Sequence, residues 1–128
     1  MTILLWCLFI SAILPFIAKI PVAYAMKKLG GYDNNHPREQ QANLKGFGAR
    51  ALAAHQNAFE SLIIFSVAIL TAITTNTIGS DIQQLAIIYV IARISYNILY
   101  LYNISTARSI VWFISLFCSL TIIWQCIP

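Results

Sequence analysis

The sequence predicts an all-α fold, a bundle of four transmembrane helices, and three observations lead to this prediction. The chain has 128 residues, of which 59% are hydrophobic and only 9% are charged, whereas about a quarter of the residues in a soluble domain carry charge. Its mean hydropathy is +0.75. Four apolar stretches each approach the roughly 20 residues that a helix needs to cross a bilayer. We therefore expect one integral membrane domain over residues 1–128.

The four expected helices cover residues 2–26, 51–75, 82–101 and 107–127. Lys19 is the single charge in the first stretch, and SLIIFSVAILTAITT in the second has none. The third is rich in β-branched residues, but an open sheet cannot exist in lipid, so its length favours a helix. The sequence AYA at residues 23–25 resembles a signal-peptide cleavage site. No Lys or Arg precedes the apolar run, however, so we expect the first helix to be retained.

The basic residues predict the orientation of the chain in the membrane. Five of them lie in or beside the first connection: Lys27, Lys28, Arg38, Lys45 and Arg50. The second connection, residues 76–81, has no Lys or Arg, and the third is followed by Arg108. By the positive-inside rule, the first and third connections face the cytoplasm and both termini face the opposite side. The net charge of +4 is therefore a topology signal, and we expect no nucleic-acid partner.

Cysteine and histidine give no indication of a metal site or a disulfide framework. Cys7, Cys118 and Cys126 are far apart and lie in or near apolar stretches. Free cysteine in such positions behaves as a small hydrophobic residue. His36 and His55 have no spacing that would bind a metal. The sequence predicts no bound metal ion.

A polar stripe at the start of the second expected helix is the first candidate for a functional site. At about 100° per residue, Arg50 and Asn57 lie almost in line, and Glu60 lies within about 60° of Asn57. Ionisable residues within a membrane segment are costly and usually serve a function. A purely structural interpretation is also open, in which Glu60 pairs with Arg50 or Arg93 and Asn57 forms an interhelical hydrogen bond.

A second polar stripe lies on one face of the third expected helix. It consists of Tyr89, Arg93, Tyr96, Asn97 and Tyr100. With Arg108 at the start of the fourth helix, three arginines can approach one another at the cytoplasmic ends of the helices. Glu60 is the one obvious carboxylate to balance them, so an anionic ligand would complete the charge balance. The alternative is that the arginines snorkel to the head groups and the tyrosines form an interfacial belt.

These residues carry a resemblance to the MAPEG family, the membrane-associated proteins of eicosanoid and glutathione metabolism. Arg50 with AHQN at residues 54–57 and Glu60 is similar to the family signature on its second helix. Ala92-Arg93, Tyr100, the ARS sequence at 107–109 and Trp112 resemble the pattern of its third and fourth helices. The resemblance covers nearly the whole chain and is strongest to the bacterial members.

The resemblance implies a homotrimer that binds glutathione between neighbouring subunits and acts on lipophilic substrates. It implies that Arg108 stabilises the glutathione thiolate. It further implies that the residues that bind glutathione are Arg50, Asn57, Glu60, Arg93 and Tyr100. The expected function is a glutathione-dependent transferase or peroxidase that acts on lipophilic electrophiles or peroxides. Membrane lipids are further expected partners, and the expected location is the bacterial inner membrane.

Three positions depart from the family pattern. Ala49 replaces a common Glu, Ala53 replaces an arginine that faces glutathione in the eicosanoid enzymes, and Ser61 replaces a Tyr found in some members. These departures argue against a leukotriene or prostaglandin synthase. They leave open a non-catalytic scaffold or lipid-binding protein, because the family includes a lipid-presenting member without enzymatic activity. A channel or transporter is less well supported, because the sequence has no filter motif or inverted repeat.

Overall fold

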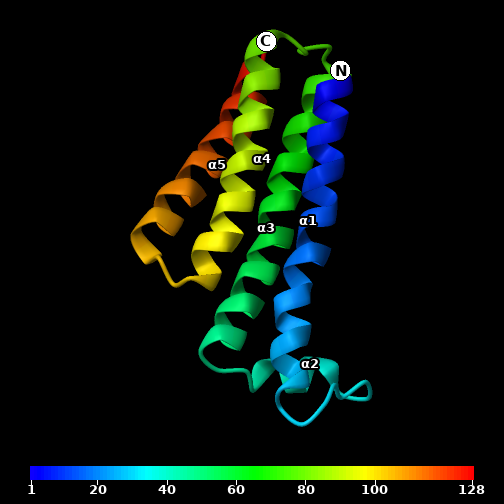
Figure 1. Cartoon of the computed structure of the whole chain (residues 1–128). Coiled ribbons are helices and arrows are strands. Elements are labelled where there is room, and N and C mark those ends of the chain that lie inside the picture. Colours follow the sequence, from blue (N-terminus) through cyan, green and yellow to red (C-terminus); the bar gives the residue numbers. More distant parts are fainter.

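The computed structural model describes residues 1–128 and contains only helices. They are α1 (Thr2–Lys27), α2 (Pro37–Ala42), α3 (Phe47–Thr74), α4 (Ser80–Leu101) and α5 (Ser105–Gln125). All except the short α2 are long and apolar enough to cross a membrane. The four long helices run side by side, with both termini at one end and α2 at the other (Figure 1). The predicted all-α bundle with four membrane-spanning helices is therefore confirmed.

The first connection contains a short helix, α2, in addition to the four predicted helices. It begins at Pro37, where the missing N–H of proline costs nothing. The Asp33 carboxylate accepts hydrogen bonds from the backbone N–H groups of Asn35 and His36. The Gln40 side chain donates to the backbone oxygen of Gly31 and accepts from the N–H of Asp33. These bonds fold the turn residues back onto α2.

Helix α3 begins four residues earlier than predicted, at Phe47. Gly46 precedes it with φ of +56°, a backbone conformation that glycine adopts without steric cost. A Cβ atom at Gly48 would lie 3.0 Å from the Ala25 Cβ and 3.0 Å from a methyl group of Leu44. This glycine lets α3 approach α1 closely at the end of the bundle that carries α2.

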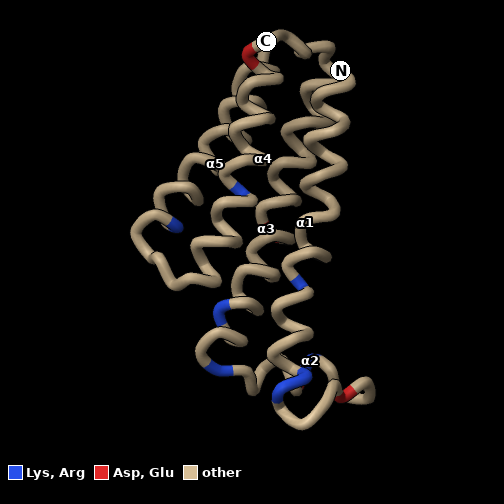
Figure 2. Tube along the Cα trace, in the orientation of Figure 1, with Lys and Arg blue, Asp and Glu red and all other residues tan.

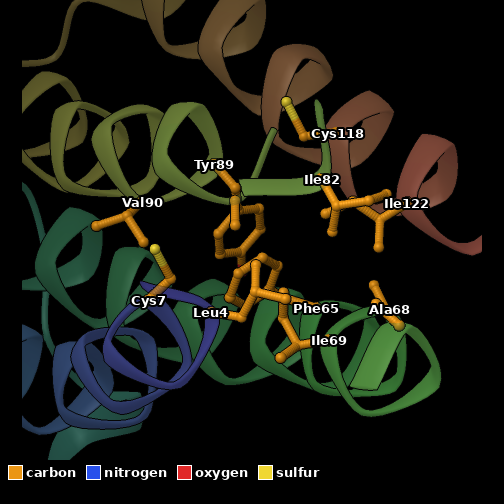
Figure 3. Close-up of a cluster of buried hydrophobic side chains, with 12 residues drawn as sticks. Leu4, Cys7, Phe65, Ala68, Ile69, Ile82, Tyr89, Val90, Cys118 and Ile122 are labelled. Carbon is orange, nitrogen blue, oxygen red and sulfur yellow. The ribbon is translucent and has the colours of Figure 1, made fainter. Parts of the chain in front are cut away.

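The main hydrophobic core includes Leu4 and Cys7 near the start of α1 and Ile122 near the end of α5 (Figure 3). It joins α1, α3, α4 and α5, and its members are Leu4, Cys7, Phe65, Ala68, Ile69, Ala72, Ile82, Ala86, Tyr89, Val90, Cys118 and Ile122. The rings of Phe65 and Tyr89 stack with their centroids 3.7 Å apart. A smaller cluster near α2 consists of Val22, Ala25, Met26, Leu44 and Ala51. The packing of α3 against α4 in the first cluster fixes the two helices that carry the polar stripes.

The outer surface of the bundle is apolar. Only 28 of the 128 residues are buried, and exposed aromatic side chains occur on three of the long helices. Phe16, Phe117 and Trp124 are between 66% and 72% exposed. An apolar surface of this extent requires lipid or another protein to cover it. The chain is therefore an integral membrane protein.

The basic residues extend from the end that carries α2 to the middle of the bundle, and none lies at the end that carries the termini (Figure 2). This distribution is the one on which the positive-inside prediction rests. The cytoplasmic orientation of that end remains a prediction, as does the homotrimer.

Candidate functional site

The two polar stripes meet at a hydrogen bond between α3 and α4. Arg93 is only 1% exposed, and its Nη2 donates to the Oδ1 of Asn57 at 2.7 Å and to the Asn57 backbone oxygen at 3.3 Å. Asn57 in turn donates from Nδ2 to the Oε2 of Glu60 at 3.1 Å. The Asn57 amide oxygen faces a donor, Arg93, and its NH2 group faces an acceptor, Glu60. These two partners determine which way the amide is oriented. Asn57 thus connects a buried cation to an exposed carboxylate.

Arg93 and Glu60 do not touch directly. The one contact within 4.0 Å between a basic and an acidic side chain in the chain joins His36 to Asp33, so Glu60 pairs with neither Arg93 nor Arg50. The structural alternative of a direct Glu60–arginine pair is therefore wrong. The expected interhelical hydrogen bond of Asn57 is present.

Arg93 also retains unused hydrogen-bonding capacity. Its Nε and Nη1 atoms are buried and have no partner, and the guanidinium carbon lies 4.2 Å from the ring centroid of Tyr96. This cation–π contact offsets part of the cost of burying the charge. Buried donors without partners are unfavourable, and these two do not line the cavity between α3 and α5.

A cavity of about 220 Å³ lies between α3 and α5 beside this group. Its lining comprises Asn57, Glu60, Ser61, Ile64, Trp112, Ser115, Leu116 and Ser119. One side is polar, and the other is formed by the apolar side chains of Ile64, Trp112 and Leu116. Behind the polar side, the Ser61 and Tyr89 hydroxyls form a 2.6 Å hydrogen bond, which links α3 to α4. The cavity therefore combines a carboxylate and an amide with an apolar surface.

Arg108 lies one helical turn before Trp112, in the first turn of α5. Its guanidinium carbon is 4.3 Å from the ring centroid of Tyr100. The side chain makes no hydrogen bond or ion pair within the chain. Its N–H donors are thus free, while the aromatic ring at the end of α4 holds the charge in place.

Arg50 lies apart from the cavity. Its Nη2 donates to the backbone oxygen of Leu101 at 3.5 Å, at the end of α4, where a helix presents unpaired carbonyl groups and a partial negative charge. Arg93 is eight residues before Leu101, which is about 12 Å along the helix axis. The structure thus brings Asn57, Glu60 and Arg93 together and places Arg50 at another depth.

The serine residues of α5 were not among the predicted site residues. Ser115 and Ser119 line the cavity and are 2% and 1% exposed. Each donates its hydroxyl to a backbone oxygen of its own helix. The spacing of Arg108, Trp112, Ser115 and Ser119 places all four on one face of a helix. That spacing was the signal in the sequence that could have identified them.

Comparison with known proteins identifies the family of the chain. The model of the MAPEG family matches residues 3–128. Neither the search of curated proteins nor the search of solved structures gave a match. Because the family match spans nearly the entire chain, this four-helix membrane protein belongs to the MAPEG family, the membrane-associated proteins of eicosanoid and glutathione metabolism.

Proposed function

We propose that the protein is a glutathione-dependent membrane enzyme, of the transferase or peroxidase type, that acts on lipophilic electrophiles or peroxides. The observation that carries the proposal is the cavity lined by Asn57 and Glu60, where Asn57 is hydrogen-bonded to the buried Arg93. Arg108 adds a second free cation one turn from the cavity wall. Together these groups offer both the positive and the negative charge that a zwitterionic peptide needs.

The residues fit glutathione, which has two carboxylates, one amine and a thiol. Glu60 is exposed and suits the amine. The unpartnered N–H groups of Arg93 suit a carboxylate or a peptide carbonyl, but they are buried, so a ligand would reach them only after the side chains around Arg93 move. A cavity of about 220 Å³ is smaller than the roughly 300–1,000 Å³ of most ligand pockets. One subunit would thus cover only part of the tripeptide. The proposed homotrimer would supply the remaining surface, and this supports a site between subunits.

When bound, glutathione supplies a thiol whose ionised form is the nucleophile. A free thiol with a pKa of about 8.5 is only a few per cent ionised at neutral pH. The guanidinium of Arg108 would stabilise the anion, and one pKa unit corresponds to about 1.4 kcal/mol. Tyr100 would keep that guanidinium in position through its ring. Ile64, Trp112 and Leu116 would hold a lipophilic substrate that arrives from the bilayer.

Arg108→Ala tests the proposed role of the arginine. In a conjugation assay with a generic electrophile, we expect the variant to lose at least tenfold in kcat/KM, equivalent to about 1.4 kcal/mol. Arg108→Lys should retain part of the rate because it keeps the charge. Lys45→Ala, which removes an exposed cation outside the cavity, serves as the control. Full activity of Arg108→Ala, with unchanged thermal stability and oligomer size, would rule out the assignment.

A non-catalytic scaffold or lipid-binding protein is the second candidate. It is favoured by the hydrogen bonds among Arg93, Asn57 and Glu60, which would join α3 to α4 without any ligand. The alanines at 49 and 53 also remove charges from the family pattern. Thermal unfolding of detergent-purified protein separates the two. Stabilisation by millimolar glutathione supports the enzyme, because a ligand of the native state raises its stability. Stabilisation by lipids alone supports the scaffold.

A further inference from the structure

A second cavity, larger than the one beside Asn57, lies on the other side of α3, against α1 and α2. Its volume is about 530 Å³. The polar and charged residues that line it are Lys19, Tyr32, Arg38, Gln41, His55 and Gln56. It shares no residue with the cavity beside Asn57. The proposed glutathione site therefore does not account for this second cavity.

The cavity carries two cations and no anion. Neither Lys19 nor Arg38 makes an ion pair or a side-chain hydrogen bond in the chain, and no Asp or Glu lines the cavity. Lys19 is also the one charged residue within the apolar part of α1. Two like charges that face one cavity repel each other, and a lysine within a membrane helix is costly. A bound anion would relieve both penalties.

Neutral hydrogen-bonding groups complete the polar part of the cavity. The Nδ1 of His55 lies 2.8 Å from the backbone oxygen of Pro15. Because a carbonyl oxygen can only accept, Nδ1 carries a proton, and Nε2 is the nitrogen left without a partner. The side-chain amides of Gln41 and Gln56 also line the cavity. The amide N–H groups of these two glutamines can donate to the oxygen atoms of a phosphate ester, whereas Nε2 of the neutral imidazole can only accept.

An aromatic surface continues from the cavity along the membrane-spanning part of α1. Phe59 lines the cavity and contacts Phe16 edge to face, with ring centroids 5.7 Å apart. Phe16 is 66% exposed and lies about one turn from Lys19, in the direction away from α2. The apolar surface thus extends from the cationic cavity toward the middle of the membrane. This is the arrangement that a headgroup and an acyl chain require.

We propose that this cavity binds the phosphate group of an anionic membrane lipid, with Lys19 and Arg38 as its ligands and with an acyl chain along Phe16 and Phe59. Basic pockets between helices at one end of a membrane bundle suit such headgroups. The apolar extension favours a lipid over a free phosphate ester. The absence of a lining carboxylate makes the cavity unsuitable for the amine of glutathione. This site is independent of the proposed enzymatic function.

The test measures lipid binding to the full chain, purified in detergent and without glutathione. Phosphatidylglycerol and phosphatidylcholine with identical acyl chains are titrated, and bound lipid is counted by native mass spectrometry. We expect phosphatidylglycerol to bind more tightly. Each cation near an anionic membrane surface contributes roughly 1 kcal/mol to binding. The double variant Lys19→Gln, Arg38→Gln, which removes two cations, should therefore bind phosphatidylglycerol about thirtyfold more weakly. Lys27→Gln, which removes an exposed lysine that does not line the cavity, should bind as the wild type does.

A single variant and a competition experiment complete the test. Arg38 is exposed on α2, so Arg38→Gln alone should fold normally and weaken phosphatidylglycerol binding about fivefold. Glycerol 3-phosphate, a soluble phosphate monoester without an acyl chain, should not compete at millimolar concentration. Equal binding of the two lipids to the wild type, or unchanged binding to both variants, would overturn the proposal. Effective competition by glycerol 3-phosphate would identify a soluble phosphate ester as the ligand instead.

Discussion

Arg93 of α4 donates a 2.7 Å hydrogen bond to the side-chain oxygen of Asn57 on α3, and this bond joins the two polar stripes of the protein. The arginine is almost completely buried, and no carboxylate lies within ion-pair distance of it. Asn57 is therefore its main partner, and through Asn57 the charge is linked to Glu60. The amide thus has two tasks, which are to satisfy a buried cation and to orient a carboxylate at the cavity.

Asn57→Leu should destabilise the protein, because it leaves the guanidinium of Arg93 buried with fewer partners. Hydrogen bonds to charged groups contribute about 1.5–3 kcal/mol, whereas interhelical bonds in membranes average about 0.6 kcal/mol. We expect a loss between these limits in the free energy of unfolding. It can be measured by denaturant titration in mixed micelles.

The double variant Asn57→Leu, Arg93→Met distinguishes this explanation from a simple packing defect. Removing both partners takes away the unsatisfied charge, so the double variant should be more stable than Asn57→Leu alone. If the destabilisations of the two single variants merely add, the hydrogen bond does not determine the stability of the α3–α4 contact.

Tyr100→Leu should lower the conjugation activity proposed for this protein. The ring of Tyr100 holds the Arg108 guanidinium carbon at 4.3 Å, and a cation–π contact at a partly exposed site contributes about 0.5–1 kcal/mol. Tyr100→Phe keeps the ring and should retain activity, whereas Tyr100→Leu should lose about two- to fivefold in kcat/KM. A loss in Tyr100→Phe equal to that in Tyr100→Leu would assign the role to the hydroxyl rather than to the ring.

Gly48→Val should destabilise the contact between α1 and α3. The added side chain would meet the Ala25 Cβ and the Leu44 side chain, and the Ala25 atom cannot move without its helix. Overpacking of this kind costs about 1–3 kcal/mol, which thermal unfolding in detergent would show as a lower Tm. Ala49→Val adds the same residue at the neighbouring exposed position and should leave Tm nearly unchanged. Similar Tm values for the two variants would show that the helices separate without cost.

The sequence was sufficient to predict the membrane-spanning helices, because length and hydropathy together permit only a helical bundle in lipid. It was less informative at the connections. The helix at Pro37–Ala42 is held by the Gln40 side chain, which donates to the Gly31 backbone oxygen and accepts from the Asp33 N–H, nine and seven residues away along the chain. The early start of α3 depends on the close approach of Gly48 to Ala25. Neither contact has a signature in the local sequence.

The sequence alone determined the fold class. It also determined on which face of its helix each polar residue lies, because helical periodicity fixes the angle of a side chain around the helix axis. The tertiary structure decided which neighbour each polar side chain meets. It paired Arg93 with Asn57 rather than Glu60, and it sent Arg50 to the Leu101 carbonyl, away from the cavity. It also brought Lys19 and Arg38 into one cavity. Periodicity sets an angle around one helix axis, whereas the partner depends on the packing and relative depth of two helices, which only the folded bundle fixes.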